Sequence, residues 1–194
     1  MDAREQLLAT TLHLLAERGY AALGLRDVAA EVGVTTGSIY HHFDSKEDLV
    51  RSAIEHYASR VLEEQRAMLR IDASAAARLW SVVDWLAMRE ADAGWQRDFS
   101  LVLNVELRKL PGFEDLYGRF RTSFFRLVRE PIRDGVASGE LSLPEGASVD
   151  DVVALVIAGV VGILQMQAHG AVRVPVDRLL RLHMATVLNS LSAS

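Results

Sequence analysis

Apolar residues recur every three or four positions along most of the chain, which is the spacing of helices that bury one face. The last such stripe is the most regular: it begins at Val176 and continues through Leu180, Met184 and Val187 to Leu191. Only four prolines interrupt the 194 residues, and the stretches between turn signals are long. The pattern therefore predicts an all-α fold.

Glycine, proline and capping residues mark where the predicted helices begin and end. A first helix ends at Arg18-Gly19, and Ser45 begins a long helix as the cap of a Ser-x-x-Asp start. The remaining predicted helices are 25–32, 36–43, 45–69, 75–91, 95–109, 113–138, 149–169 and 176–191.

The two short helices predicted at 25–32 and 36–43 are separated by only three residues, of which the first is Gly33. Two helices joined by such a turn form a helix-turn-helix, which can present its second helix to a DNA major groove about 12 Å wide. Ile39 and Phe43 would anchor that helix to the core, and most of its other side chains carry hydrogen-bonding groups. A small helical bundle with a polar surface helix would show the same pattern.

The composition excludes several classes of protein. Half of the residues are hydrophobic and 24% are charged, so the chain is globular rather than disordered, with room for one to two domains. The absence of cysteine excludes disulfide frameworks and thiol nucleophiles. The charged first residues are unlike a signal peptide, and the longest apolar run, 152–164, is shorter than the ~20 residues of a membrane span. We expect a cytoplasmic protein without a membrane contact.

No enzyme motif is found in the sequence. It contains no phosphate-binding glycine loop, no His-Glu-x-x-His zinc motif and no Gly-x-Ser-x-Gly nucleophile motif. His41 and His42 are neighbours, and consecutive side chains on a helix point about 100° apart, so the pair is poorly placed to share a metal ion. We therefore predict no catalytic residue, no metal and no cofactor.

Four short sequences between Ala16 and Val50 carry a family resemblance. They are Arg-Asp-Val-Ala from Arg26, Gly-Val from Gly33, Gly-Ser-Ile-Tyr-His-His-Phe from Gly37 and Ser-Lys-Glu-Asp-Leu from Ser45. With these residues, the chain resembles the DNA-binding domain of the TetR family of bacterial transcription regulators over residues 4–55, without gaps. It departs from the family at Leu23-Gly24, where Thr or Ser is usual, so a hydroxyl cap and a candidate phosphate contact are lost.

The resemblance implies a three-helix DNA-binding domain at 1–55, with the helix-turn-helix at about 24–43. It implies a helical ligand-binding and dimerisation domain at 56–194. The second helix of the motif would contact the bases, whereas Arg26 and Lys46 would hold the DNA backbone. The predicted DNA-binding residues are Arg26, Thr35, Thr36, Gly37, Ser38, Tyr40, His41, His42 and Lys46.

The C-terminal two thirds of the chain resembles the family only in layout. The run from Ile132 to Leu141 is similar to the usual end of the longest helix in that domain, and the last two helices would form a homodimer. Ala158, Gly159 and Gly162 would permit close helix approach at the dimer contact, or equally core packing within one subunit.

Large apolar side chains with a few polar ones would line a ligand pocket in this domain. Such walls suit a lipophilic or amphipathic small molecule, although most of these residues would be ordinary core. The candidate pocket residues are Trp85, Met88, Phe99, Asn104, Phe124, Gln165 and His169.

The function implied by the resemblance is a repressor that binds a pseudo-palindromic double-stranded operator as a homodimer and is released by a small-molecule effector. Two alternatives stay open: a ligand-sensing helical protein that no longer binds DNA, and a small helical enzyme with a buried pocket. The identity of the ligand, the operator sequence and the sign of regulation are not readable from the sequence.

The charge distribution runs against the usual rule that DNA-binding domains are basic. The chain has a net charge of -5, and residues 1–50 alone contain four Lys or Arg and eight Asp or Glu. Arg26, Lys46 and the histidines would therefore face DNA, with acidic residues such as Glu17 and Glu31 turned away. We expect weak non-specific affinity and a heavier reliance on specific contacts.

Overall fold

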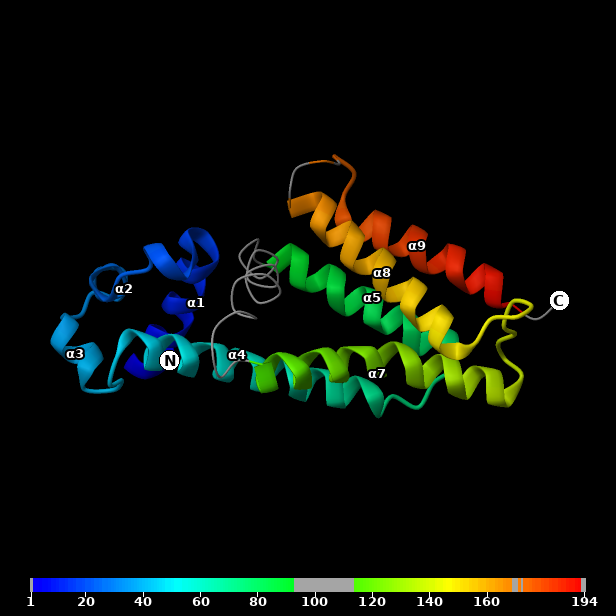
Figure 1. The fold of residues 1–194 in the computed structure, drawn as a ribbon, viewed down its shortest axis with the longest axis horizontal. Helices are drawn as coiled ribbons and strands as arrows, with labels where there is room; N and C mark the ends of the chain where they lie inside the picture. The colour runs from blue at the N-terminus through cyan, green and yellow to red at the C-terminus, as the bar shows by residue number, and fades with distance from the viewer. Residues whose placement is uncertain (1, 93–113, 169–170, 172, 193–194) are drawn as a thin grey trace. The chain divides into compact units, whose positions relative to one another are not determined.

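The computed structural model describes residues 2–92, 114–168, 171 and 173–192 (Figure 1). These residues form helices, and their one extended pairing is an isolated bridge between Leu141 and Ser192. The predicted all-α fold is confirmed.

The helix bounds agree closely with the predicted segments. They coincide for α2 and α9, and the bounds of α4, α5, α7 and α8 differ from the prediction by one residue at one end. The predicted helix 95–109 lies outside the described residues. The helices are α1 (Ala3–Ala22), α2 (Leu25–Val32), α3 (Thr36–Tyr40), α4 (Lys46–Leu69), α5 (Ala75–Asp92), α7 (Glu114–Ser138), α8 (Val149–Ala168) and α9 (Val176–Leu191).

Helix α1 begins and ends with features that its sequence dictates. Asp2 and Glu5 form a reciprocal capping box, in which the Glu5 backbone N–H donates to Asp2 Oδ1 at 2.7 Å. The stop predicted at Gly19 is a break instead of an end: Gly19 has φ 72°, and one further turn follows to Ala22. Glycine reaches this left-handed region without a steric penalty, so the break costs little.

The chain divides into two compact units. The first contains Met1–Val61 and Asp98–Gly118, of which 2–61 and 114–118 are described, and the second contains Leu62–Arg97 and Arg119–Ser194. Helix α4 contributes to both units, since the division falls between Val61 and Leu62.

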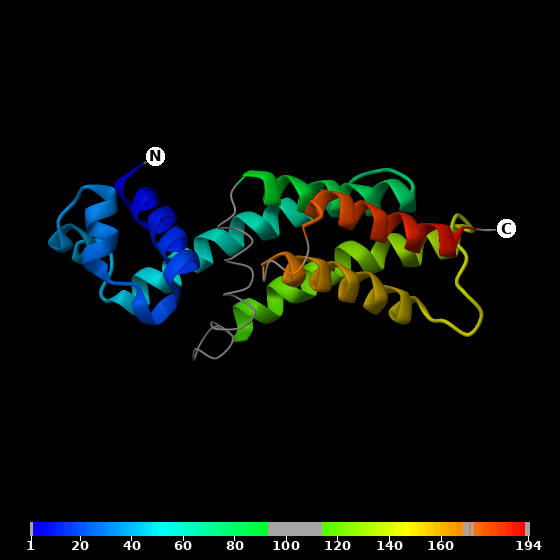
Figure 2. The ribbon, with the colours of Figure 1, turned by 90° about the horizontal axis from the view of Figure 1, so that it is seen from above.

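The second unit is built on packing between α9 and its two neighbours, α5 and α8 (Figure 1, Figure 2). A Cβ added to Gly159 of α8 would overlap the ring of His183 on α9, whose Nε2 lies 3.1 Å from the carbonyl oxygen of Val156. Gly159 therefore serves core packing within the subunit. A Cβ added to Gly162 would meet no atom within 4 Å, and Ala158 is exposed.

The end of α7 explains the Gly-x-x-x-Gly spacing in the sequence. A Cβ on Gly135 would lie 2.7 Å from the Cβ of Ala75 and 2.8 Å from the side chain of buried Leu141, so only glycine fits. Gly139 then turns the chain with φ 79°. These two glycines bring the residue that follows, Glu140, to the start of α5.

Glu140 caps the N-terminus of α5 across 65 residues of sequence. Its Oε2 accepts the backbone N–H of Ala75 at 2.8 Å, and its Oε1 accepts that of Ala76 at 2.9 Å. A carboxylate at this position satisfies two helix-end donors and complements the helix dipole. The hydrogen bond from Ala76, followed by that from Ala75, holds the pKa of Glu140 below its usual value.

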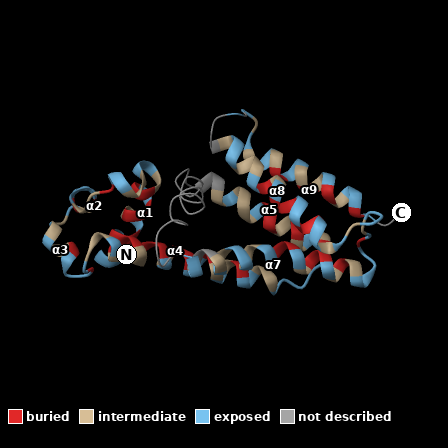
Figure 3. Cartoon of the chain, in the orientation of Figure 1, coloured by how far each residue is buried: buried red, intermediate tan, exposed pale blue. Residues whose placement is uncertain are grey.

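The outer surface of α8 is apolar and only sparsely covered. In the described part of the chain, Val149–Gln167 is one segment long and apolar enough to cross a membrane by length and composition, and 28% of it is buried (Figure 3). The core helix of a soluble protein passes the same test of length and composition. Leu155 of α8 is 58% exposed, and Leu182 of α9 is 63% exposed.

We predict that Glu140→Gln lowers the free energy of unfolding by about 1 kcal/mol at neutral pH, because a neutral amide oxygen is a weaker cap than a carboxylate. Denaturant titration at pH 7 measures this difference. Glu145→Gln, at an exposed site in the following loop, is the matched control.

The effect of Glu140→Gln should depend on pH. Because the pKa of Glu140 is lower in the folded state than its usual 4.5, the carboxylate stabilises the fold above pH 4.5. That contribution disappears as the pH falls through the folded-state pKa. Wild type and variant should therefore converge in acid, and a difference that persists unchanged there would contradict the role of the charge.

Candidate nucleic-acid interface

The turn between α2 and α3 depends on glycine. Gly33 adopts a left-handed conformation with φ 78° and ψ 30°, and its N–H donates to the carbonyl oxygens of Ala29 and Ala30. The next N–H, from Val34, reaches the Ala29 carbonyl at 2.9 Å. This arrangement closes α2 and redirects the chain within three residues.

Helix α3 starts at a hydroxyl cap. The Ser38 backbone N–H donates to Thr35 Oγ1 at 3.1 Å, and the two hydroxyl oxygens lie 2.9 Å apart. Thr35 and Ser38, two of the predicted DNA-binding residues, thus contact one another at the start of α3. Their hydroxyl groups orient the first turn of a helix that has only five residues.

Two buried side chains hold α3 and the following turn on the first unit. Ile39 and Phe43 are buried, together with Val28 of α2. The remaining surface is polar and open: Tyr40 is 57% exposed, and Gly37 is exposed as well. Thr36 and Ser38 are half-buried.

His41 and His42 lie in the turn after α3 and not on the helix, which corrects the predicted helix end at residue 43. The His42 N–H donates to the Ile39 carbonyl three residues back, at 2.9 Å, which is the tighter 3₁₀ spacing often found at a helix end. Both imidazoles are exposed. They extend the polar surface beyond the end of α3.

Gly24 is the N-cap of α2 and offers no side-chain hydrogen bond. A Cβ at this position would lie 2.7 Å from Asp27 Oδ2, so the Asp27 carboxylate occupies the space that a capping side chain would need. Asp27 also forms a weak ion pair with Arg18, at 3.8 Å. A glycine at position 24, where the family usually has Thr or Ser, therefore leaves room for the Asp27 carboxylate.

Lys46 joins the start of α4 to the end of α1. Its Nζ donates to the Tyr20 carbonyl oxygen at 2.7 Å and lies 4.5 Å from the centre of the Tyr20 ring, while the Tyr20 hydroxyl donates to Glu47 at 2.9 Å. Burial, followed by the contact with Glu47, raises the pKa of Tyr20. The pKa of Glu47 is lowered by its own backbone N–H and by the Tyr20 hydroxyl.

Tyr20 has no role in the sequence prediction, because its position one residue after the Gly19 break is not part of any apolar stripe. In the structure, Lys46 contacts Tyr20. Its predicted contact with the DNA backbone would have to form beside this interaction. An ammonium group has three N–H donors, so two stay available after the bond to Tyr20.

Several acidic residues of the first unit are used at helix starts. Asp2 caps α1, and the Asp48 carboxylate accepts the Asp44 N–H at 3.0 Å. Glu17 lies 3.4 Å from His13. By contrast, Arg26 is exposed and forms no ion pair with any residue that the structure describes. Some carboxylates of this unit therefore have a role in helix capping, whereas Arg26 is a cation open to solvent.

Of the predicted pocket residues, the structure describes Trp85, Met88, Phe124 and Gln165. Trp85 donates its Nε1–H to Glu64 at 2.9 Å, and Phe124 packs against the core of the second unit. Met88 is 62% exposed, and Gln165 is exposed. Phe99, Asn104 and His169 lie outside the described residues. Among the described residues, no group of three His, Asp or Glu could hold a metal ion.

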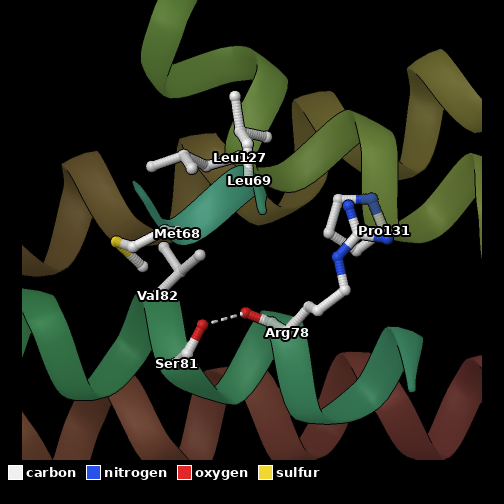
Figure 4. Close-up of a pocket in the computed structure, with 7 residues that line it drawn as sticks. All are labelled: Met68, Leu69, Arg78, Ser81, Val82, Leu127 and Pro131. Atoms are coloured by element: carbon white, nitrogen blue, oxygen red, sulfur yellow. Dashed lines mark hydrogen bonds between the residues drawn. The ribbon is translucent and has the colours of Figure 1, made fainter. Parts of the chain in front are cut away.

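A different set of residues lines a crevice between the end of α4, α5 and α7 (Figure 4). None of them belongs to the predicted pocket set, since their meeting depends on the contact of three helices. The Arg78 side chain extends toward Pro131, and the Ser81 hydroxyl donates to the Arg78 carbonyl at 2.7 Å (Figure 4). The lining residues are Met68, Leu69, Arg78, Ser81, Val82, Leu127 and Pro131.

Comparisons with known proteins identify the helix-turn-helix region. Residues 7–53 match the family model of bacterial regulatory proteins of the tetR family. The chain is 35% identical over 138 residues to the transcriptional repressor KstR2 of Rhodococcus jostii, an alignment that covers 68% of this chain and 66% of the repressor. The chain thus spans a little less than two thirds of that relative.

Solved structures share the fold along nearly the whole chain. A transcriptional regulator from Saccharomonospora viridis, crystallised with choline, superposes with a TM-score of 0.86 at 23% identity and covers 99% of this chain and 98% of its own. FadR from Bacillus subtilis, crystallised with stearoyl-CoA, has a TM-score of 0.76 at 18% identity, covering 96% of this chain and 98% of its own. With the family match over the helix-turn-helix, the chain belongs to the TetR family of bacterial regulatory proteins.

Proposed function

We propose that this protein is a ligand-responsive transcriptional repressor, which binds a pseudo-palindromic operator as a homodimer and leaves it when a small molecule binds. The observation that carries the proposal is the exposed polar surface of α3 and the turn after it, which is held in place by the buried side chains of Ile39 and Phe43. The protein would act in the cytoplasm, where its operator lies.

Base recognition would fall to the residues that project from this surface. Tyr40, His41 and His42 are exposed, and Gly37 leaves room for close approach of the DNA backbone. Arg26 supplies an exposed cation on α2 for a phosphate, and Lys46 keeps N–H donors beyond its bond to Tyr20. Two copies related by a two-fold axis would contact two half-sites of opposite direction.

Dimerisation through α8 and α9 is supported by their exposed apolar residues. On α8, Leu155, Ala158, Gly162 and Met166 recur every three or four residues and so share one face. Leu155 and Met166 are exposed, as is Leu182 of α9, and nothing lies within 4 Å of a Cβ built on Gly162. A second copy of the chain would cover this face and bury it from water.

A small-molecule effector would bind the second unit and would be lipophilic or amphipathic. It can release the operator only through its different affinities for the DNA-bound and the free shape of the dimer. Helix α4 offers a route for this coupling, because Lys46 near one end belongs to the first unit and Met68 near the other lines the crevice in the second.

Selection from fragmented genomic DNA with the purified protein tests the proposal. We expect enrichment of one pseudo-palindromic sequence, because a symmetric dimer reads two related half-sites. If repeated selections return no enriched palindrome, the chain does not act through a specific operator.

Tyr40→Ala should weaken binding to the selected operator by at least tenfold without unfolding the protein, since Tyr40 is mostly exposed. Gel-shift titration measures the affinity, and thermal melting checks the fold. Tyr40→Phe separates the contribution of the hydroxyl group from that of the ring. Undiminished affinity of Tyr40→Ala would remove Tyr40 from the interface.

Arg26→Gln should lower affinity for all DNA sequences to a similar degree. Losing one phosphate contact in each protomer should reduce the slope of log K against log salt concentration by roughly 2. Fluorescence anisotropy measures this slope when the affinity is determined at several salt concentrations between about 50 and 200 mM. Arg70→Gln, at an exposed cation of the second unit, is the matched control and should leave the slope unchanged.

Leu155→Glu should convert the dimer to a monomer, because it places a charge in each copy at the proposed contact of α8. We expect the dissociation constant to rise by about 100-fold or more. Sedimentation equilibrium measures it, and Ile71→Glu is the matched control, since Ile71 is an exposed aliphatic residue outside α8 and α9. Identical sedimentation of the two variants would contradict this interface.

A further inference from the structure

Gln65 is a fully buried polar side chain that the fold does not satisfy. Its exposed fraction is 0%, yet neither Oε1 nor Nε2 has a hydrogen-bond partner within the described structure. Buried amide groups in folded proteins nearly always have partners, and each exception calls for a physical explanation. Thr11, the other buried polar side chain among the described residues, follows the rule, because its hydroxyl donates to the Leu7 carbonyl at 2.7 Å.

The position of Gln65 in the second unit relates it to the crevice between α4, α5 and α7. Met68 and Leu69 follow it by three and four residues, so they lie on the same side of α4, and both line the crevice. Glu64, the residue before it, bonds to Trp85 of α5. Gln65 thus lies one helical turn along α4 from the lining residues, on the side that faces the interior.

The crevice has its own unsatisfied polar atom. The Nε of Arg78 is buried without a partner in the described structure, although its NH1 pairs with Asp134 at 2.9 Å. Most of the other lining is apolar, with Leu69, Val82 and Leu127 among the walls (Figure 4). The crevice is too narrow to hold a water molecule, so water within it does not satisfy the Arg78 Nε.

An unsatisfied buried amide makes the closed form of this region less stable than it would be with an apolar residue. Each unpaired group costs roughly a factor of ten in the folding equilibrium. A bound molecule that supplies the missing hydrogen bonds removes this cost, so its binding favours an opened form of the crevice over the closed one. The same feature that destabilises the free protein would therefore increase affinity for a matching ligand.

We propose that Gln65 is the residue that selects the effector, by hydrogen bonding to a neutral polar group on an otherwise apolar molecule. This inference rests on the proposed function, since it assumes that the second unit binds a ligand. An amide offers one acceptor and two donor hydrogens, which match a hydroxyl or a carboxamide. A carboxylate fits poorly, because an anion is costly to bury between apolar walls and the nearby Arg78 guanidinium is already paired with Asp134.

The first experiment compares the stability of the ligand-free chains. Gln65→Met keeps the length of the side chain and removes its polar atoms, so the melting temperature should rise by about 2–4 °C. Thr11→Val is the matched control: it removes a satisfied hydroxyl and should not raise the melting temperature. A lower melting temperature for Gln65→Met would show that the amide is satisfied inside the fold and would overturn the proposal.

The second experiment measures binding of three six-carbon probes by calorimetry: 1-hexanol, 1-fluorohexane and hexanoate. Wild type should bind 1-hexanol about fivefold or more tightly than Gln65→Met does, as expected for one added hydrogen bond. The two chains should bind 1-fluorohexane alike, and hexanoate should bind wild type more weakly than 1-hexanol.

Equal affinity of the two chains for 1-hexanol, including no measurable binding by either, would overturn the role of Gln65, as would preferential binding of hexanoate. These measurements contain no DNA. Their failure would therefore leave the proposed operator binding intact, whereas a failed operator selection would not change the probe affinities.

Discussion

The surface that this protein can present to DNA depends on the burial of Ile39 and Phe43. Helix α3 has five residues, far fewer than an isolated helix needs to be stable in water. It persists because its apolar side packs against α2 and because Thr35 caps its first turn. The exposed side chains of Tyr40, His41 and His42 therefore have a defined position only while this packing is intact.

The acidic character of the first unit is compatible with this surface because charge acts locally. Carboxylates at Asp2 and Asp48 accept backbone N–H groups at the starts of α1 and α4, where helix dipoles favour negative charge. Glu47 is held by its own backbone and by Tyr20. These acidic groups stabilise the helices, and Arg26 stays exposed to solvent. Net charge counts all of these groups equally, although their positions give them different roles.

The second unit contains closely packed helix contacts and also buried polar atoms without a hydrogen-bond partner among the described residues. Around Gly135 and Gly159, the absence of a side chain lets helices approach until no added atom would fit, and Glu140 completes the start of α5. Near Gln65 and Arg78, buried polar atoms lack partners in the part of the chain that the structure describes. A region that is fully packed keeps its shape, whereas one with unsatisfied polar atoms gains stability from a ligand. The closely packed helices around Gly135 and Gly159 would then form the rigid scaffold, and the region near Gln65 and Arg78 would respond to an effector.

The all-α fold, the bounds of α2 and α9 and the helix-turn-helix are all predictable from the amino-acid sequence, because apolar periodicity, caps and glycine stops act over a few residues. The sequence also singled out the run from Ile132 to Leu141 without giving its purpose. Contacts between helices, by contrast, place Gly159 under His183, let Glu140 cap a helix 65 residues away and join Lys46 to the Tyr20 carbonyl. They also accompany the end of α3 at Tyr40 and leave Gln65 without a partner among the described residues. Such features depend on which residues meet across helices, and local periodicity carries no information about those distances.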